Sequence, residues 1–324
     1  MRVLITGGAG YIGSHAVRAA LDSGLQVTVL DDLSTGHREA IDTRARFVHG
    51  SLTDPAALAD ALEGCEAVMH FAAFSIVSES CRVPLKYWAN NVGGSIALLQ
   101  GMAAAGVHRL VFSSTAATYG LARSIPIQEG TPQAPINPYG QTKLAVEKLI
   151  ADHAAATPEF GFAVLRYFNV AGCAWGLGEA HQPETHLIPI VLQAALGQRK
   201  SVSIFGADYD TPDGTCVRDY VHVRDLVDAH VLVVGKLAAG DRRVYNVGSG
   251  RGWSVREVID AAKKVSGVDF QVGQGLRREG DPPTLVTDPT RLREQLGWEA
   301  KHSALEQILA DHWEWMREHP AGYG

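Results

Sequence analysis

The sequence predicts an α/β fold, with a doubly wound parallel sheet and a second, smaller α/β lobe. Short apolar runs alternate with helical stretches in the first half of the chain, and the first of these runs leads into a group of glycines. After Gly172 the pattern changes to longer polar loops between shorter elements. Apolar strands joined by helical crossovers form a doubly wound sheet, which binds ligands at the carboxyl ends of its strands.

The elements of the first half follow from apolar runs and helix start signals. Strands buried on both faces are predicted at residues 3–6, 27–30, 67–71, 110–112 and 162–167, because each run is short and almost wholly apolar. A helix is expected to begin at Asp54-Pro55, since Asp54 is a good N-cap and Pro55 suits the first turn. Two longer helices are predicted over residues 84–105 and 138–155.

The second half mixes shorter helices and strands. Helices are predicted over residues 187–197, 225–237 and 304–317, and strands over residues 201–205 and 244–247. Ser254 is expected to open another helix, because Glu257 stands three residues later and completes a capping box. A short helix is predicted to start at Asp288-Pro289.

The clearest binding signal is the glycine group Gly7, Gly10 and Gly13, followed by Asp31 at the end of the second strand. Glycines at this spacing allow a tight turn and a close backbone approach to a pyrophosphate at a helix N-terminus. Asp31 would accept both hydroxyls of the adenine ribose and repel a 2′-phosphate, so the pattern predicts NAD rather than NADP. Glycines that only shape a strand-to-helix turn are the alternative, and the order of strand, helix and acid disfavours it.

These signals predict two domains. Residues 1–172 are expected to form a Rossmann domain that binds NAD, and residues 173–324 a smaller lobe over the carboxyl ends of the sheet, where the substrate binds. The segment at about residues 217–240 is expected to cross back to the first domain.

Composition narrows the classes of function. The 324 residues are 46% hydrophobic and 20% charged, with a net charge of −6 and no long charged run, which disfavours nucleic acid as a partner. No apolar run has the length of a membrane span, and the first strand starts too early for a signal peptide. Cys65, Cys81, Cys173 and Cys216 are far apart, as expected of free buried thiols in the cytoplasm. The 13 histidines form no HExxH or paired ligand motif, so no metal site is expected.

The strongest catalytic signal is Tyr139 followed by Lys143. Residues four apart share a helix face, so the phenol and the ammonium would lie side by side. A free tyrosine has a pKa of about 10. The ammonium and a positive nicotinamide ring would lower it, which suits a base that takes a proton from an alcohol. A surface helix carrying both residues by chance is the alternative.

A Ser/Thr segment, residues 113–118, follows the fourth predicted strand. Thr115 could hydrogen-bond the reacting hydroxyl and the Tyr139 oxygen. Alternatively, these side chains only satisfy backbone groups at a strand end. Position favours a functional role for Thr115 but not for Ser114.

Taken together, these motifs resemble the extended short-chain dehydrogenase/reductase family over nearly the whole chain, and within it the branch of UDP-sugar 4-epimerases. The segments that carry the resemblance are TGGAGYIGSH at 6–15, HFAA at 70–73, NNV at 90–92, SSTAATYG at 113–120, NPYGQTK at 137–143, LRYFNVAG at 165–172, SIFGADYDTPDGTCVRDYVHV at 203–223, YNVGSG at 245–250 and RREGDPP at 277–283.

The resemblance implies a C4 epimerisation that interconverts UDP-glucose and UDP-galactose by oxidation to a 4-keto sugar, rotation and re-reduction with bound NAD. Tyr139 would be the base, Lys143 its partner on the nicotinamide ribose, and Thr115 the hydroxyl beside them. Cofactor contacts are implied for Gly7, Gly10, Tyr11, Ile12, Gly13, Asp31, Asp32, Ser51, Leu52, Phe71, Ala72, Ala73, Asn90, Ser113, Tyr139, Lys143 and Phe168. Substrate contacts are implied for Thr115, Tyr139, Asn169, His186, Leu187, Ser203, Phe205, Arg218, Arg278, Asp281 and Leu285.

Within these sets, the two arginines would clamp the diphosphate. Phe205 would pack near uracil, and Asp281 would bind the uridine ribose. The alternative for Arg218 and Arg278 is an ion pair with the neighbouring acids Asp219 and Glu279.

Four positions bear on the family pattern, and one of them, Ser75, stands where some relatives have lysine and others do not. Ser51 stands where many relatives carry an acid that holds the adenine amino group, so a weaker contact is expected there. His186 stands where some members have asparagine. Leu285 stands where some have a tyrosine that narrows the hexose pocket, so the smaller leucine leaves room for an N-acetyl group.

Other functions remain open at this point. A sugar-nucleotide dehydratase would carry an acid just after the Ser/Thr, but Thr115 is followed by Ala116 and Ala117. A net NAD-dependent dehydrogenase of the same family is a second alternative, and a non-catalytic NAD-sensing or scaffold protein is a third. Related enzymes pair the helices predicted at 84–105 and 138–155 across a two-fold axis, so the resemblance implies a homodimer.

Overall fold

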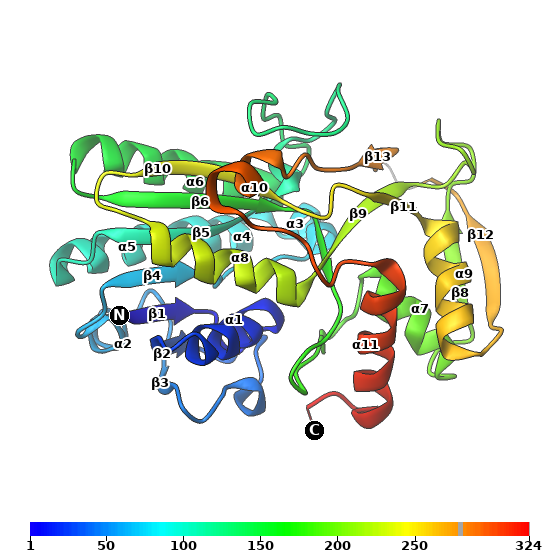
Figure 1. Cartoon of the computed structure of the whole chain (residues 1–324), viewed down its shortest axis with the longest axis horizontal. Helices are drawn as coiled ribbons and strands as arrows, with labels where there is room; N and C mark the ends of the chain where they lie inside the picture. The colour runs from blue at the N-terminus through cyan, green and yellow to red at the C-terminus, as the bar shows by residue number, and fades with distance from the viewer. Residues whose placement is uncertain (278–280, 324) are drawn as a thin grey trace.

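The computed structural model describes residues 1–277 and 281–323, which form two lobes side by side (Figure 1). Among the described residues, the larger lobe contains a seven-stranded sheet in the order β10-β6-β5-β4-β1-β2-β3, with every pair parallel. Its strands are β1 (Arg2–Thr6), β2 (Gln26–Asp31), β3 (Arg46–His49), β4 (Ala67–His70), β5 (Arg109–Thr115), β6 (Gly161–Tyr167) and β10 (Arg242–Val247). The predicted doubly wound α/β fold is confirmed.

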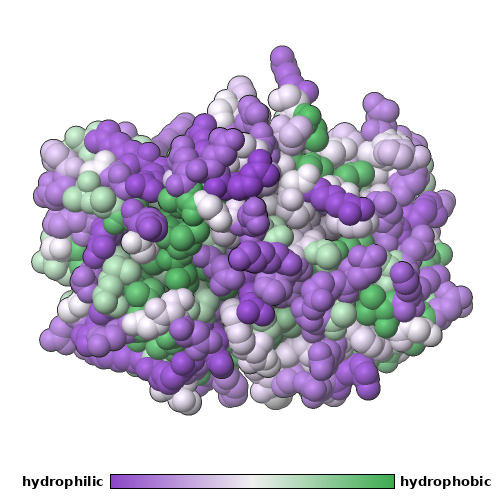
Figure 2. Space-filling view, in the orientation of Figure 1, coloured by the Kyte–Doolittle hydropathy of each residue, from purple (hydrophilic) through white to green (hydrophobic). Residues whose placement is uncertain are grey.

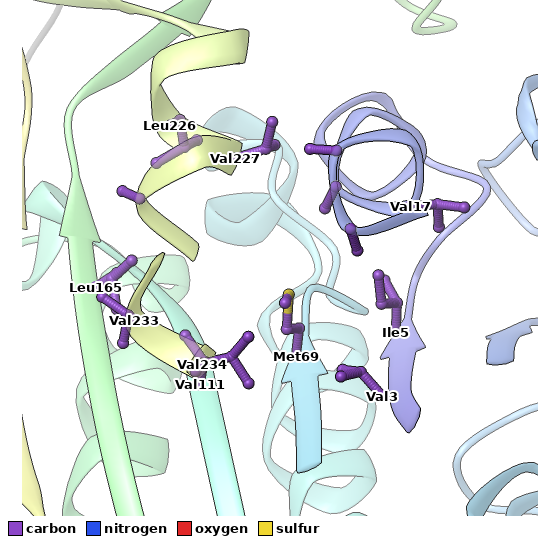
Figure 3. Packing of buried hydrophobic residues seen from close by; sticks show 14 of the residues in the cluster. Val3, Ile5, Val17, Met69, Val111, Leu165, Leu226, Val227, Val233 and Val234 are labelled. Atoms are coloured by element: carbon purple, nitrogen blue, oxygen red, sulfur yellow. The ribbon is translucent and has the colours of Figure 1, made fainter. Parts of the chain in front are cut away.

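Helices cover both faces of this sheet because successive strand residues point to opposite sides. Val3 and Ile5 of β1 pack toward α1 (Tyr11–Asp22) and α8 (Val223–Lys236), as Figure 3 shows, whereas Leu4 faces the other side. That other side is covered by α2 (Pro55–Leu62), α5 (Gly94–Ala105) and α6 (Pro138–Ala156). The inner strands β1, β4, β5 and β6 are thus buried on both faces, as their apolar sequences predict.

The smaller lobe is built around a third apolar cluster. Its helices are α7 (Leu187–Ala195), α9 (Val255–Ser266) and α11 (Leu305–Glu318). A small sheet joins β7 (Asn169–Ala171), β9 (Val217–His222), β11 (Gly252–Ser254) and β13 (Thr284–Leu285), and β8 (Ser201–Phe205) pairs with β12 (Gln271–Gly275). The predicted capping box is present, since Ser254 accepts from the Glu257 backbone and Glu257 from that of Ser254.

Several elements differ from the sequence-based predictions. The strand β3 was not predicted, because its sequence RFVH holds only two apolar residues, so the strand that carries Thr115 is the fifth rather than the fourth. The helix expected over residues 84–105 is split into α4 (Pro84–Tyr87), a π-helical stretch (Trp88–Gly93) and α5, and α3 (Val77–Arg82) precedes it.

The strand predicted at residues 244–247 is β10, which lies at the edge of the large sheet. The chain therefore runs back through the large lobe over α8 and β10, farther than the predicted residue 240. The short helix α10 (Thr290–Leu296) begins after Pro289 rather than at Asp288. Short 3₁₀ turns occupy Arg38–Ala40 and Ala116–Thr118.

The surface is mixed in polarity. Hydrophilic residues cover most of the face in Figure 2, with hydrophobic residues gathered in patches between them. In the part of the chain that the structure describes, no helix is both long enough and apolar enough to traverse a lipid bilayer. The four cysteines are free, and Cys81 is exposed rather than buried as predicted.

Candidate active site

The carboxyl ends of the neighbouring strands β1, β4, β5 and β6 lie next to one another at one end of the large sheet. Gly7, Phe71 and Phe168 directly follow β1, β4 and β6, and Thr115 is the last residue of β5. The order of the strands reverses between β1 and β4, because the chain adds β2 and β3 on one side of β1 and β4 on the other. Doubly wound sheets bind their ligands outside the carboxyl ends of the strands at such a point.

The glycine loop after β1 has room for backbone only. Gly7 has φ +72°, and a Cβ there would lie 2.6 Å from the Ala72 nitrogen. A Cβ on Gly13 would lie 2.0 Å from the Gly7 carbonyl oxygen, so α1 packs directly on the loop. Gly10 is the N-cap of α1 and provides no side-chain cap, so no side chain of the N-cap residue satisfies the amide groups of the first turn. This cradle fits a pyrophosphate at the helix N-terminus.

Asp31 lies beside the glycine loop at the end of β2. Its Oδ2 accepts from the Ala9 amide at 2.9 Å and its Oδ1 from the Leu33 amide at 2.8 Å. Burial raises the pKa of Asp31, and these two hydrogen bonds partly offset that effect. Each oxygen keeps a second lone pair, which matches the two vicinal hydroxyls of a ribose.

The other predicted cofactor residues surround this edge of the sheet. Asp32 is exposed and caps the Ser34 amide, and the Ser51 hydroxyl is 3.1 Å from that of Thr53. The Tyr11 hydroxyl donates to the Gly172 carbonyl at 2.5 Å. The half-buried members of the set are Tyr11, Ile12, Ser51, Leu52, Phe71, Ala72, Ala73 and Asn90, and the buried ones include Ser113 and Phe168.

The catalytic candidates meet where α6 passes the end of β5. Asn137 caps this helix by accepting from the Gly140 amide at 2.8 Å, which places Tyr139 in the first turn and Lys143 one turn later. The Tyr139 side chain hydrogen-bonds that of Thr115. Lys143 Nζ donates to the Ser113 carbonyl at 2.7 Å. The structure thus brings the three predicted residues together.

The protein environment favours the uncharged forms of both Tyr139 and Lys143. Burial raises the pKa of Tyr139 to about 12, and the hydrogen bond with Thr115 partly offsets this. Burial also lowers the pKa of Lys143 to about 7, against the attraction of the Glu147 carboxylate. The protein groups alone therefore do not lower the Tyr139 pKa as predicted, because desolvation by burial outweighs the opposing hydrogen bond with Thr115.

Sequence reasoning missed two buried groups beneath this site. Glu147, one turn after Lys143 on α6, forms an ion pair with Arg166 of β6 at 2.6 Å. It also accepts a hydrogen bond from Ser114, which gives that serine a structural role. Asn91 joins the π-helical stretch to α6 by donating to the Thr142 hydroxyl at 3.1 Å. The i, i+4 continuation from Lys143 was the one sequence signal for Glu147.

In the smaller lobe, Arg218 and Asp281 face each other. Arg218 Nη2 and Asp281 Oδ1 are 2.5 Å apart, and Arg218 is aligned with Leu285 in the β9–β13 pair. The acid next in sequence, Asp219, is buried and instead accepts from the amides of Ser249, Gly250 and Thr287. The alternative in which Arg218 pairs with Asp219 is therefore wrong. Asn169 lies on β7 and is aligned with Tyr220 in the β7–β9 pair.

The remaining predicted substrate residues are spread over the lobe. Leu187 opens α7, and Ser203 and Phe205 lie on exposed positions of β8. Arg278, with its neighbour Glu279, lies outside the described residues. His186, the N-cap of α7, contacts Glu179 and Glu184 at 2.8 and 3.0 Å. These carboxylates hold the pKa of His186 well above its usual value, although its burial acts in the opposite direction.

Comparison with known proteins places these features in one family. The model of the NAD dependent epimerase/dehydratase family matches residues 3–248. The chain is 50% identical to a UDP-glucose 4-epimerase of Lactobacillus helveticus, with 100% of this chain and 99% of the relative covered. Its fold is similar to that of the UDP-glucose 4-epimerase from Brucella ovis in complex with NAD, with a TM-score of 0.92, 43% identity and coverage of 96% and 98% of the two chains. For the UDP-Glc/GlcNAc 4-epimerase from Campylobacter jejuni, the TM-score is 0.86 at 42% identity, with coverage of 98% and 99%. The chain belongs to the NAD dependent epimerase/dehydratase family, within its branch of UDP-glucose 4-epimerases.

Proposed function

We propose that this chain interconverts UDP-glucose and UDP-galactose with NAD as a resident cofactor. The observation that carries the proposal is the meeting of Tyr139, Thr115 and Lys143 beside the glycine cradle of β1. The family membership supports the reaction class. The match to the UDP-glucose 4-epimerase of Lactobacillus helveticus covers 99% of that relative.

Tyr139 acts as the acid and base of the reaction. NAD held by the glycine cradle and Asp31 would supply the hydride acceptor and donor for C4 of the sugar. Tyr139 takes the proton of the C4 hydroxyl in the first step and gives it back in the second, and Thr115 orients both oxygens. The Lys143 ammonium stabilises the phenolate in this buried site, where a charge interaction is stronger than in water.

Epimerisation requires a firm hold on UDP and a weak hold on the hexose, because the 4-keto sugar must turn over between the two hydride transfers. We infer that Arg218 and Arg278 bind the diphosphate and that Asp281 binds the uridine ribose. Two nitrogens of the Arg218 guanidinium donate hydrogen bonds: Nη1 to the Val217 carbonyl and Nη2 to the Asp281 carboxylate. The guanidinium has five N–H donors in all, so others stay available for phosphate oxygens. Asn169, Leu187, Ser203 and Phe205 complete the nucleotide side.

A dehydratase or a net dehydrogenase remains the second candidate within the family. Ala116 and Ala117 form the 3₁₀ turn after Thr115, so no acid at these positions is ready for an elimination step. The test is to incubate the purified protein with UDP-galactose and no added cofactor. We expect UDP-glucose to form without steady accumulation of NADH. A growing NADH signal would indicate the dehydrogenase instead, and loss of water from the sugar would indicate the dehydratase.

Leu285 suggests that N-acetylhexosamines are also substrates. Its half-buried side chain packs against the cluster formed by Ala116, Tyr119, Ile127 and Phe168, beside the catalytic edge. The Campylobacter jejuni relative is described as a UDP-Glc/GlcNAc 4-epimerase. We expect Leu285→Tyr to lower turnover of UDP-N-acetylgalactosamine at least 10-fold and to leave UDP-galactose turnover within about 2-fold, since the ring would fill the space beside C2.

Parallel assays of both substrates check this prediction. Leu285→Met, which keeps the volume of the side chain, is the matched control and should leave both rates unchanged. Equal rates for both substrates in Leu285→Tyr would contradict the role of Leu285 in substrate selection.

We infer that the chain forms a homodimer through the helices over residues 77–105 and α6. Large apolar residues are exposed on the first of these segments: Val83, Leu85 (80% exposed), Trp88 and Ile96. Such a cluster is typical of a surface that another protein covers. Light scattering at micromolar concentration should give twice the chain mass, and Leu85→Glu should shift it toward the monomer. A monomer in the wild type would contradict this inference.

The thiols support a cytoplasmic location for this enzyme. All four cysteines are free, and Cys65, Cys173 and Cys216 are buried. Unpaired thiols are typical of proteins that work in a reducing compartment.

A further inference from the structure

A cluster of two histidines and two glutamates lies in the loop between β7 and α7, outside the catalytic residues. Glu179, His181, Glu184 and His186 each offer one ligand atom, and these four atoms lie within 4.8 Å of one another. No metal site was expected from the sequence, because its histidines form no HExxH or paired ligand motif; the residues here follow the pattern Glu-x-His-x-x-Glu-x-His. The loop alone brings these side chains together.

The side chains of the cluster are in direct contact through ion pairs. The Glu179 Oε1 atom lies 3.0 Å from His181 Nδ1 and 2.8 Å from His186 Nδ1, and Glu184 Oε1 lies 3.0 Å from the latter. Ligands at about 2.0 Å from a tetrahedral ion are separated by ~3.3 Å. Small side-chain shifts would therefore place all four around one ion.

The burial of Glu179 is an independent observation that points to a cation. Its side chain is only 1% exposed, and that of Glu184 only 4%. Among the described residues, the second carboxylate oxygen of Glu179, Oε2, is buried and has no hydrogen-bond partner. Buried carboxylates are normally paired in full or coordinate a metal.

We propose that Glu179, His181, Glu184 and His186 bind one divalent transition-metal ion of the zinc class. Two imidazole nitrogens favour zinc over calcium or magnesium, which prefer oxygen ligands. The two carboxylates supply two negative charges, so the complex with a divalent ion is neutral, as suits a largely buried site.

The place of the cluster indicates a positioning role rather than a catalytic one. His181 lies edge-on to Tyr11 at 6.3 Å between ring centroids, and Tyr11 is the first residue of α1 after the glycine cradle. The Ala180 carbonyl hydrogen-bonds the His37 ring at 3.0 Å. On the other side, His186 directly precedes α7 of the smaller lobe. The metal ion would thus fix the loop that connects the start of α1, beside the glycine cradle, with α7 of the smaller lobe.

The test is zinc binding by the full chain with its NAD bound. After removal of metal with a chelator, calorimetric titration with Zn²⁺ should show one equivalent per chain, and millimolar Mg²⁺ should not compete. We expect His181→Gln and Glu184→Gln to weaken zinc binding at least about 100-fold. His108→Gln changes a half-buried histidine at the amino end of β5, and this variant should bind zinc as the wild type does.

Two further measurements keep the result interpretable. Circular dichroism and the melting temperature confirm that each variant is folded, and Zn²⁺ should raise the melting temperature of the wild type but not of His181→Gln. Co²⁺ in place of zinc should give visible absorption typical of low-coordinate nitrogen and oxygen ligands. A wild type that takes up no zinc, or a His181→Gln variant that binds it as tightly, would overturn the metal site without affecting the epimerase assignment.

Discussion

Replacing Tyr139 with phenylalanine is expected to lower kcat for UDP-galactose epimerisation by about 10²- to 10⁴-fold, the range that general acid–base catalysis contributes. The variant keeps the ring that packs at the start of α6 and loses only the hydroxyl that hydrogen-bonds Thr115. A loss of 10³-fold corresponds to about 4 kcal/mol of transition-state stabilisation. Because the hydroxyl carries the proton in both half-reactions, kcat should fall far more than KM rises.

The measurement is steady-state epimerisation without added cofactor, together with the amount of NAD that remains bound after purification. Tyr245→Phe is the matched control: it removes a hydroxyl from another buried tyrosine, which donates to Gln295 at 2.9 Å in the far edge strand. We expect this control to keep nearly full activity. If Tyr139→Phe retains more than about a tenth of the wild-type kcat, another group serves as the base.

The features that could be predicted from sequence are local ones. The short, continuous apolar runs predicted the inner strands, because a strand buried on both faces needs apolar side chains at nearly every position. Asp54 accepts from the Ala56 and Ala57 amides, and Asn137 caps α6, as N-cap residues do. The glycine loop depends on backbone geometry, which the residue type itself restricts. For β3 this reasoning failed, since the strand pairs on one side only and its sequence is half polar.

What could not be predicted depends on contacts between distant parts of the chain. Arg218 lies next to Asp219 in sequence, yet pairs with Asp281, 63 positions away. The direction of the Tyr139 pKa shift follows from burial under the loops, and the spacing to Lys143 holds no information about burial. The cluster around Glu179 is local in sequence, but its convergence depends on the path of an irregular loop, for which there is no periodic pattern.

The ion pair between Glu147 and Arg166 supports the second large prediction, which concerns stability. Both side chains are 7% exposed, and the carboxylate also accepts from Gln133 at 3.0 Å and from Ser114. Glu147→Gln would leave the Arg166 guanidinium buried without its counter-charge. We expect the free energy of unfolding to fall by about 3–5 kcal/mol, the usual result of removing one partner of a buried pair.

Urea denaturation of the wild type and of Glu147→Gln measures this loss. The control is Glu159→Gln, which changes an exposed acid between α6 and β6 and should alter the free energy of unfolding by less than about 0.5 kcal/mol. The double variant Glu147→Leu/Arg166→Met removes both charges and should be less destabilised than Glu147→Gln, because neither charge then remains buried alone. The single variants Glu147→Leu and Arg166→Met complete the comparison: if the double variant loses as much stability as these two losses added together, packing rather than charge pairing explains the effect.

Glu147 also has a consequence for catalysis that a purely structural residue would not have. Its negative charge opposes the effect of burial on Lys143, whose pKa is lowered to about 7. Removing that charge lowers the Lys143 pKa further, so the ammonium loses its proton at a lower pH. Since the proposed mechanism needs a charged Lys143 beside Tyr139, the alkaline limb of the kcat/KM profile should move to lower pH in Glu147→Gln. An unchanged profile in the folded variant would restrict Glu147 to stability, whereas a shift would show that one carboxylate stabilises both the β6 arginine and the catalytic ammonium.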